Sequence, residues 1–292
     1  MKGKTKPAIE IQPLIDIISL TLQTGFLEDG LSGYSPASLL LIAKPESGKT
    51  TAIKEFRHLP FIYYTDEITS KVILEKILPF TQGERPQKRF IMIPDILNSI
   101  EKQTYTRLPL INTLKSLTDE GLTKVETPFK YHETLGKNPV KLGFISAITQ
   151  KGLHAGGQYS VKNDLKRVGF MSRLTPFSYR YPINKIAKIL NYIKDEDAKG
   201  KYDNKQIKTI KIKTPAKLKR YTRKGEIFEP LIEISKYLGE QSDAYGLRSQ
   251  QRLQKLAMAN AMINDRDEVT EEDVNKIVEL SEYMNLEFNL LR

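Results

Sequence analysis

The sequence predicts an α/β fold, in which a parallel sheet is sandwiched by helices and followed by a helical lid. Two observations support this fold class: apolar runs alternate with helical patterns in the first part of the chain, and the second part is mostly helical. Apolar runs of strand length fit residues 38–43, 61–64, 89–93, 142–148 and 175–181. Helical patterns lie between them at 49–58, 69–78 and 96–117. Such alternation is typical of a wound parallel sheet.

The first predicted helix, at residues 11–25, has an apolar face formed by Ile11, Leu14, Ile15, Ile18 and Leu22. These positions follow the helical period, and Gly25 is a typical helix end. The run 38–43 that comes next is apolar at almost every position. This composition predicts a parallel strand that is buried on both faces.

The change of pattern at Pro182 predicts a domain boundary. Beyond it, helices fit residues 183–195, 226–239, 247–264 and 270–285. The last of these begins with Thr270-Glu-Glu-Asp273, which resembles a capping box and places acids at the positive end of the helix. We therefore predict an α/β core at 1–182 and a helical lid at 183–292, with a basic insertion at 203–225.

The composition predicts a globular chain with anionic partners. A net charge of +11 and a pI near 9.4 favour nucleic acid as the partner, although a basic surface alone gives the same values. Cysteine is absent and the three histidines lie far apart, which argues against disulfides and structural zinc. No apolar run approaches the roughly 18 residues that span a bilayer, and the start lacks a secretory signal. We therefore expect a cytoplasmic protein without membrane contact.

The strongest motif is Ala43-Lys-Pro-Glu-Ser-Gly48-Lys49-Thr50, between an apolar strand and a helix. It matches the Walker A pattern of a P-loop, except that Ala43 stands in place of the first glycine. In such a loop backbone N–H groups converge on phosphate oxygens, the lysine contacts the β/γ-phosphates and the hydroxyl binds Mg²⁺. We therefore predict a site for ATP and Mg²⁺ formed by Ala43, Lys44, Pro45, Glu46, Ser47, Gly48, Lys49, Thr50 and Thr51.

The acidic half of this site is predicted at Asp95, at the end of the apolar run 89–95. Asp95 would hold Mg²⁺ together with Thr50. The usual Asp-Glu pair is absent, and two alignments stay open: either Ile96 occupies the position of the catalytic glutamate, or Pro94 replaces the aspartate and Asp95 is the base. Either departure predicts slow hydrolysis. A third reading makes Asp95 only the cap of the following helix.

Four further segments, in the right order, make the chain resemble the AAA+ superfamily. Residues 143–150 are similar to the strand that carries the sensor-1 residue, here Thr149 or Gln150, although such residues also occur simply as hydrogen-bonded strand ends. Residues 169–173 resemble the helix end that presents an arginine finger, and 246–248 resemble the sensor-2 region of the lid. Residues 257–274 look like the lid of minichromosome-maintenance helicases and MoxR-type ATPases.

The resemblance covers residues 11–288 and implies an ATPase that hydrolyses ATP at the subunit interfaces of a homo-oligomer, a ring or a helical filament. Its catalytic residues would be Asp95, Thr149, Gln150, Arg173 and Arg248. An isolated arginine is more often a solvated or ion-paired surface residue. The order of the motifs is therefore what supports the assignment of Arg173 and Arg248.

Residues 122–141 are a first candidate for contact with nucleic acid. They predict a β-hairpin, because Val125, Thr127, Phe129 and Tyr131 alternate before a Gly-containing turn. Members of the resembling family that have a hairpin here direct it into their central pore, where Lys130, Tyr131 and Lys137 would contact phosphates and bases. The alternative is an edge hairpin that lysines protect from pairing.

Residues 205–224 are a second candidate, with nine Lys or Arg and no acid. Lys217, Lys219, Arg220 and Arg223 lie around Tyr221, a composition typical of phosphate binding with a stacking aromatic. A basic surface within the subunit and a protein partner are the alternatives. The leading interpretation of the chain is a DNA-associated ATPase of a replication, helicase-loading or mobile-element system. A MoxR-type protein remodeller and a slow, nucleotide-gated assembly platform are the other two.

Overall fold

The structure is a computed structural model, which describes residues 11–29, 33–34, 36–77, 88–101, 104–123, 125–127, 130–132, 139–155, 160–194, 211–222, 225–286 and 289–290. Its centre is a parallel sheet with the strand order β10-β9-β3-β8-β5-β4. These strands are β3 (Leu39–Ala43), β4 (Ile62–Tyr64), β5 (Phe90–Ile93), β8 (Gly143–Thr149), β9 (Thr175–Arg180) and β10 (Asn289–Leu290). The five strands predicted from the sequence are confirmed, each within a residue of its predicted ends.

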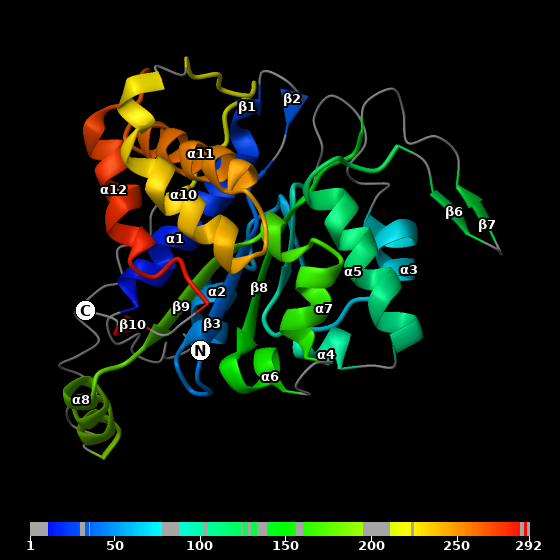
Figure 1. Ribbon diagram of the computed structural model, residues 1–292, viewed down its shortest axis with the longest axis horizontal. Helices are drawn as coiled ribbons and strands as arrows, with labels where there is room; N and C mark the ends of the chain where they lie inside the picture. The colour runs from blue at the N-terminus through cyan, green and yellow to red at the C-terminus, as the bar shows by residue number, and fades with distance from the viewer. Residues whose placement is uncertain are drawn as a thin grey trace, which may run out of the picture.

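Strand β3 lies inside the sheet, between β8 and β9 (Figure 1). All of its residues are buried, as its continuous apolar run predicts. Successive side chains of a strand point to opposite faces. Leu39 and Leu41 accordingly belong to one hydrophobic cluster, and Leu40 and Ile42 to another.

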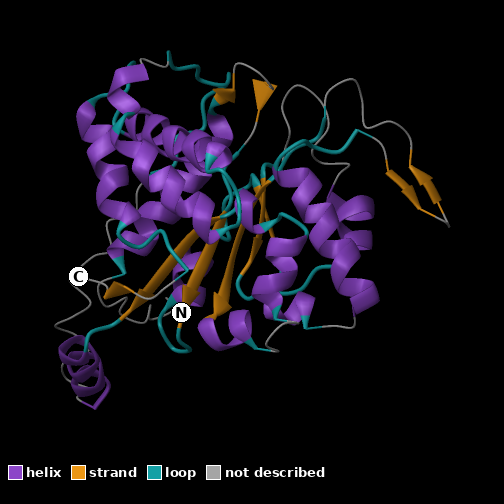
Figure 2. Cartoon of the chain, in the orientation of Figure 1, coloured by secondary structure: helices purple, strands orange, loops and turns teal. Residues whose placement is uncertain are grey.

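Helices cover both faces of this sheet (Figure 2). One face carries α1 (Gln12–Gln23), the 3₁₀ turn Thr24–Phe26, α2 (Lys49–Glu55) and the lid. The other carries α3 (Ser70–Val72) with a π-helical turn (Ile73–Ile77), α4 (Leu97–Ile100), α5 (Thr104–Thr118), α6 (Gln150–His154) and α7 (Val161–Arg167). The α/β sandwich predicted from the alternating pattern is therefore confirmed.

The lid consists of α10 (Pro230–Gln241), α11 (Leu247–Ile263) and α12 (Glu271–Ser281), after a 3₁₀ turn at Gly225–Phe228. Helix α11 directs Leu253, Leu256, Ala257 and Ala261 into the same hydrophobic cluster that contains α1. The lid and the core therefore share one hydrophobic interior. Helix α8 (Ile183–Lys194), which follows β9, stands apart at the lower left of Figure 1 and leaves Ile183 86% and Leu190 60% exposed.

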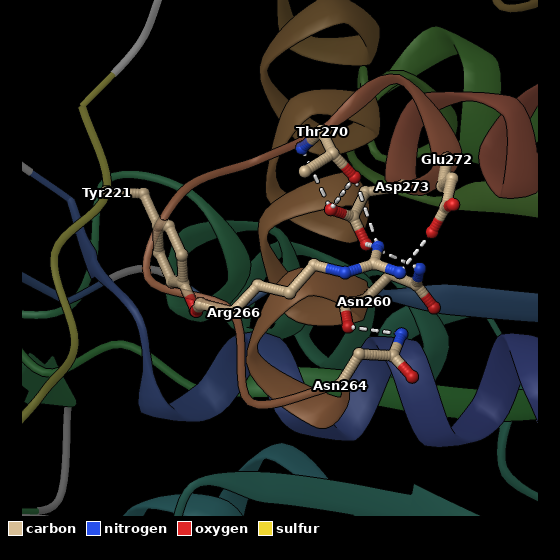
Figure 3. A network of polar contacts seen from close by, with 7 residues as sticks. All are labelled: Tyr221, Asn260, Asn264, Arg266, Thr270, Glu272 and Asp273. Carbon is tan, nitrogen blue, oxygen red and sulfur yellow. Dashed lines mark hydrogen bonds and ion pairs between the residues drawn. The ribbon is translucent and has the colours of Figure 1, made fainter.

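A buried carboxylate fixes the turn between α11 and α12 (Figure 3). Asp273 is 0% exposed and accepts hydrogen bonds from the N–H and the hydroxyl of Thr270, both at 2.9 Å. This closes the capping box that the sequence predicts. Arg266 Nη1 and Asn260 Nδ2 donate to the other carboxylate oxygen at 2.7 and 2.8 Å. The Asp273 carboxylate thus accepts four hydrogen bonds, which connect the two helices.

The hairpin predicted within 122–141 is present, but its turn lies elsewhere than predicted. Strand β6 (Val125–Thr127) pairs antiparallel with β7 (Lys130–His132), with Thr127 opposite Lys130. The two strands are therefore joined between Thr127 and Lys130, and not by a turn after Tyr131. A second small hairpin pairs β1 (Glu28–Asp29) with β2 (Gly33–Tyr34).

Candidate nucleotide-binding site

The loop between β3 and α2 has the backbone of a phosphate cradle. Gly48 has a φ of +86°, a left-handed conformation that glycine adopts without steric cost. It leads into α2, whose first N–H groups have no partner within the helix. Ala43, by contrast, lies in regular strand conformation at the end of β3. An alanine therefore fits where the Walker A pattern has its first glycine.

Lys49 is buried inside this loop, with 7% of its surface exposed. Its ammonium donates to the carbonyls of Ala43 and Lys44 at 3.1 and 2.7 Å and to the Ser47 hydroxyl at 3.0 Å. Burial lowers the pKa of Lys49 to about 8, and the charge of Asp95 opposes this shift. The loop thus holds a cation at its centre, and this cation interacts electrostatically with Asp95, the predicted acidic residue.

Asp95 lies just beyond the end of β5 and is half-buried. Its Oδ1 accepts a hydrogen bond from the Leu97 N–H at 3.0 Å, so that it satisfies the start of α4 while it also faces Lys49. Ile96 is 1% exposed and belongs to the hydrophobic interior. The helix-capping role considered from the sequence is therefore present, together with proximity to the P-loop.

The side chains at this edge of the sheet suit Mg·ATP. Lys49 offers an ammonium to phosphate oxygens, and Thr50 and Thr51 are exposed in the first turn of α2. Across the described part of the chain, no three His, Cys, Asp or Glu side chains gather as a metal site. Mg²⁺ commonly takes only one or two protein ligands together with phosphates and water. Thr50 and Asp95 are residues that could hold it in that way.

Thr149 and Gln150 lie at the same edge, because Thr149 pairs with Ala43 across β8 and β3. The Thr149 hydroxyl accepts a hydrogen bond from the Gly152 N–H at 3.0 Å and caps α6, which begins at Gln150. The structure thus brings both predicted sensor-1 residues next to the P-loop. It also gives Thr149 the local role of a hydrogen-bonded strand end.

Two tyrosines that sequence reasoning missed, one in β9 and one directly after it, contact the P-loop. The hydroxyls of Tyr179 and Tyr181 donate to the carbonyl of Ser47 at 3.0 and 2.8 Å. Tyr179 is 0% exposed, and burial raises its pKa. No local motif marks these residues, since the contact joins positions 132 and 134 residues apart in sequence.

The two predicted catalytic arginines meet at Asp119, which follows α5. Arg173 Nη2 lies 3.1 Å from Asp119 Oδ2, and Arg248 Nε donates to the same oxygen at 2.8 Å. Arg252, which the sequence did not single out, lies beside them and donates to the carbonyl that precedes Arg173 at 2.6 Å. Burial lowers the pKa of Arg173, and that of Arg252 to about 9, while Asp119 opposes both shifts. Glu120 adds a more distant carboxylate, 3.9 Å from Arg173. The cluster therefore carries net positive charge.

This arginine cluster and the P-loop lie at opposite ends of the parallel strands, that is, at the two opposite edges of the sheet that the strand ends form. Arg173 precedes β9, whose first residue pairs with Leu39, the first residue of β3. The P-loop follows the other end of β3, which is five residues long. That strand spans about 17 Å. Arg248 shares Asp119 with Arg173, so neither arginine reaches the P-loop of its own chain in this arrangement.

The candidates for nucleic-acid contact lie in different settings. Lys217 and Arg220 are exposed, and Lys130 and Tyr131 lie on β7, in the hairpin at the right of Figure 1. Lys137 and Arg223 lie outside the described residues.

Lys219 and Tyr221 instead have partners within the subunit. Tyr221 is 6% exposed, and its hydroxyl donates to the Arg266 carbonyl at 2.9 Å. Lys219 Nζ donates to the same carbonyl at 2.9 Å and to Asp267 at 3.1 Å. The expectation that Tyr221 offers a stacking face is therefore wrong, because its ring fills the hydrophobic cluster beneath this segment.

The fold and the P-loop define the chain as an α/β nucleotide-binding protein with a helical lid. Residues 241–281, from the end of α10 to the end of α12, match the family model of the AAA lid domain. This match covers the lid alone and, together with the P-loop core, supports assignment to the AAA+ ATPase superfamily, while the narrower resemblance to minichromosome-maintenance and MoxR lids has no such match. Comparison with curated proteins gives no match. Among the described residues, none of the helices combines the length and the apolar character needed to cross a bilayer.

Proposed function

We propose that the chain binds Mg·ATP in its P-loop and hydrolyses it slowly at the interfaces of a homo-oligomer. The observation that carries this proposal is that the P-loop and Arg173 lie at opposite edges of one sheet. A head-to-tail contact brings the arginine edge of one subunit to the P-loop edge of the next. Contacts of this heterologous kind generate rings or helical filaments.

Within one subunit, Lys49 supplies the cation for the β/γ-phosphates and the loop N–H groups receive the remaining oxygens. Thr50 and Asp95 would hold Mg²⁺, which when bound neutralises phosphate charge. The influence of Asp95 on the pKa of Lys49 supports the assignment of both residues to one nucleotide. Thr149 and Gln150, at the same edge, are candidates for orienting the attacking water.

Arg173 and Arg248 would complete the site of the neighbouring subunit. An arginine at the γ-phosphate stabilises transition-state charge and contributes about a thousandfold or more in rate. Both side chains are paired with Asp119 in the single chain, so a neighbour's phosphate would replace this carboxylate as their partner.

Mixing two inactive variants tests this arrangement. Arg173→Ala should bind ATP nearly normally and hydrolyse it slowly, and Lys49→Ala should not bind it. In a mixed oligomer, the P-loop of the first variant meets the arginine of the second, and part of the ATPase activity should return. Wild-type turnover per subunit should also rise with protein concentration. No recovery on mixing, together with concentration-independent turnover, would make Arg173 a structural residue.

A nucleotide-gated assembly platform is a second candidate, favoured by the apolar and buried Ile96. With Ile96 in the position after Asp95, the chain has no glutamate there to activate water. The platform would bind ATP and oligomerise with it, and turnover would stay near the uncatalysed rate even in the assembled state. ATPase rates across the oligomerisation range separate the two candidates.

DNA is the partner that we propose for this ATPase, on the basis of its net charge of +11 and the exposed Lys217 and Arg220. Each phosphate contact releases counterions and contributes about 0.9 to the slope of log K against log salt. Lys217→Ala with Arg220→Ala should therefore flatten the slope by up to about two on duplex DNA. Lys236→Ala, at an exposed lysine of α10, serves as the control. An unchanged slope would reassign the segment to protein contact, as in a MoxR-type remodeller.

A further inference from the structure

Two tyrosine hydroxyls converge on one backbone oxygen of the P-loop. Tyr179 lies in β9, and Tyr181 follows Arg180, the last residue of that strand. Their hydroxyls donate to the Ser47 carbonyl at 3.0 and 2.8 Å. A carbonyl oxygen has two lone pairs, and these two donors match that capacity.

The orientation of this carbonyl also sets the orientation of the next N–H. The Ser47 C=O and the Gly48 N–H belong to one peptide unit, which is planar and trans, so that they point in opposite directions. An oxygen held toward β9 therefore directs the Gly48 N–H away from β9. Gly48 does not fix this orientation by itself, because glycine adopts positive and negative φ with similar ease.

We propose that Tyr179 and Tyr181 are positioning residues that hold the Gly48 N–H in its phosphate-binding orientation. This inference rests on the proposed ATP binding and identifies the residues that hold the loop in the conformation needed for it. Rotation of the 47–48 peptide would turn a carbonyl oxygen toward the phosphates and the N–H away from them. The two hydroxyls oppose that rotation, since it breaks both of their bonds.

Tyr179 also connects this carbonyl to the P-loop lysine. Its hydroxyl lies 3.5 Å from the Ser47 Oγ, which accepts a hydrogen bond from Lys49 Nζ at 3.0 Å. Burial raises the pKa of Tyr179, so that its hydroxyl keeps its proton and remains a donor. The same tyrosine thus orients one peptide and lies beside the residue that holds the lysine.

The tyrosine rings are themselves held in place. The rings of Tyr179 and Tyr181 pack edge to face, with 6.0 Å between their centres. The centre of the Phe177 ring lies 6.4 Å from that of Tyr179. Lys185 Nζ lies 5.7 Å from the centre of the Tyr181 ring. Because the rings are fixed by packing, little side-chain entropy is lost when the hydroxyls hold the loop.

Phenylalanine variants test the inference, since they keep the rings and remove only the hydroxyls. The double variant Tyr179→Phe, Tyr181→Phe should bind Mg·ATP on the order of tenfold more weakly in calorimetry, as two neutral hydrogen bonds are lost. Tyr181→Phe, at a half-buried residue, should weaken binding a few-fold and decides the question where the double variant does not fold. Tyr221→Phe is the matched control, because this buried hydroxyl also donates to a carbonyl, at 2.9 Å, but in the lid.

The outcomes separate the inference from the proposed function. The inference predicts weakened ATP binding in the Tyr179 and Tyr181 variants and wild-type affinity in Tyr221→Phe, even where thermal stability falls equally. Wild-type affinity in Tyr181→Phe and in the double variant, with binding still lost in Lys49→Ala, would overturn the inference and leave ATP binding intact. Absence of ATP binding in the wild type would overturn the proposed function, and the inference with it.

Discussion

Binding of Mg·ATP at alkaline pH should be accompanied by proton uptake at Lys49. Burial lowers the pKa of this lysine to about 8 in the free chain, and Asp95 opposes the shift. A phosphate beside the ammonium favours its charged form and raises the pKa in the bound state. The free lysine thus holds fewer protons than the bound lysine wherever the pH approaches or exceeds 8. The affinity for Mg·ATP is therefore highest below pH 8 and falls as the pH rises above 8.

The size of the effect follows from the pKa of the free chain. With a value of about 8, uptake is about 0.1 proton per ATP at pH 7, about 0.5 at pH 8 and about 0.9 at pH 9. The Kd should rise by about tenfold for each pH unit above 8. Calorimetry in two buffers of different ionisation enthalpy measures the number of protons directly.

Lys49→Arg is the control, because the ordinary pKa of a guanidinium group lies about two units above that of an ammonium group, so that the arginine keeps its charge where the lysine titrates. Any binding that this variant retains should take up no proton. Tight wild-type binding with no proton uptake at pH 9 would refute the reasoning. Uptake that persists in Lys49→Arg would place the titrating group elsewhere.

Three further predictions concern the acidic residues. Asp95→Asn should retain Mg·ATP binding but lose Mg²⁺-dependent phosphate release, and turnover at the wild-type rate would place the catalytic acid elsewhere. Asp119→Asn should lower the Tm, because it removes the nearest negative charge from Arg173. Added sulfate should raise the Tm of this variant by more than it raises that of the wild type. An equal increase in both proteins would contradict an anion site. Asp273→Asn should cost about 3 kcal/mol in urea unfolding, because a buried carboxylate with four donors loses its charge. Glu272→Gln, at a side chain 77% exposed, should cost less than about 1 kcal/mol, and equal losses would contradict this account.

The strands of the core were predictable because a parallel strand buried on both faces leaves a continuous apolar run in the sequence. The P-loop was predictable for a similar reason, since its chemistry depends on neighbouring residues. The start of α12 was marked by Thr270 and Asp273, three positions apart. In each case, the signal and the structure involve the same few consecutive residues.

The features that sequence reasoning missed depend on contacts between distant segments. Arg248 meets Asp119 across 129 positions, and Tyr179 meets Ser47 across 132. Neither partner carries a local pattern that points to the other. Tyr221 was wrongly interpreted for a related reason: its neighbours in sequence are basic, whereas the ring belongs to the hydrophobic cluster that the core and the lid share. Burial decides the role of an aromatic residue, and local composition does not determine burial.

The arginine cluster is not well explained as a device for stability. Arg173 and Arg248 pair with Asp119, Glu120 lies 3.9 Å from Arg173, and Arg252 lies beside them without a carboxylate partner among the described residues. Burial lowers the pKa of Arg173 and Arg252. The buried Nε atoms of both arginines also lack a hydrogen-bond partner among the described residues. Removing cations from water without full compensation costs stability. Such an arrangement fits a surface that receives an anion, and in the head-to-tail oligomer that we propose this anion would be the phosphate held by the next subunit's P-loop.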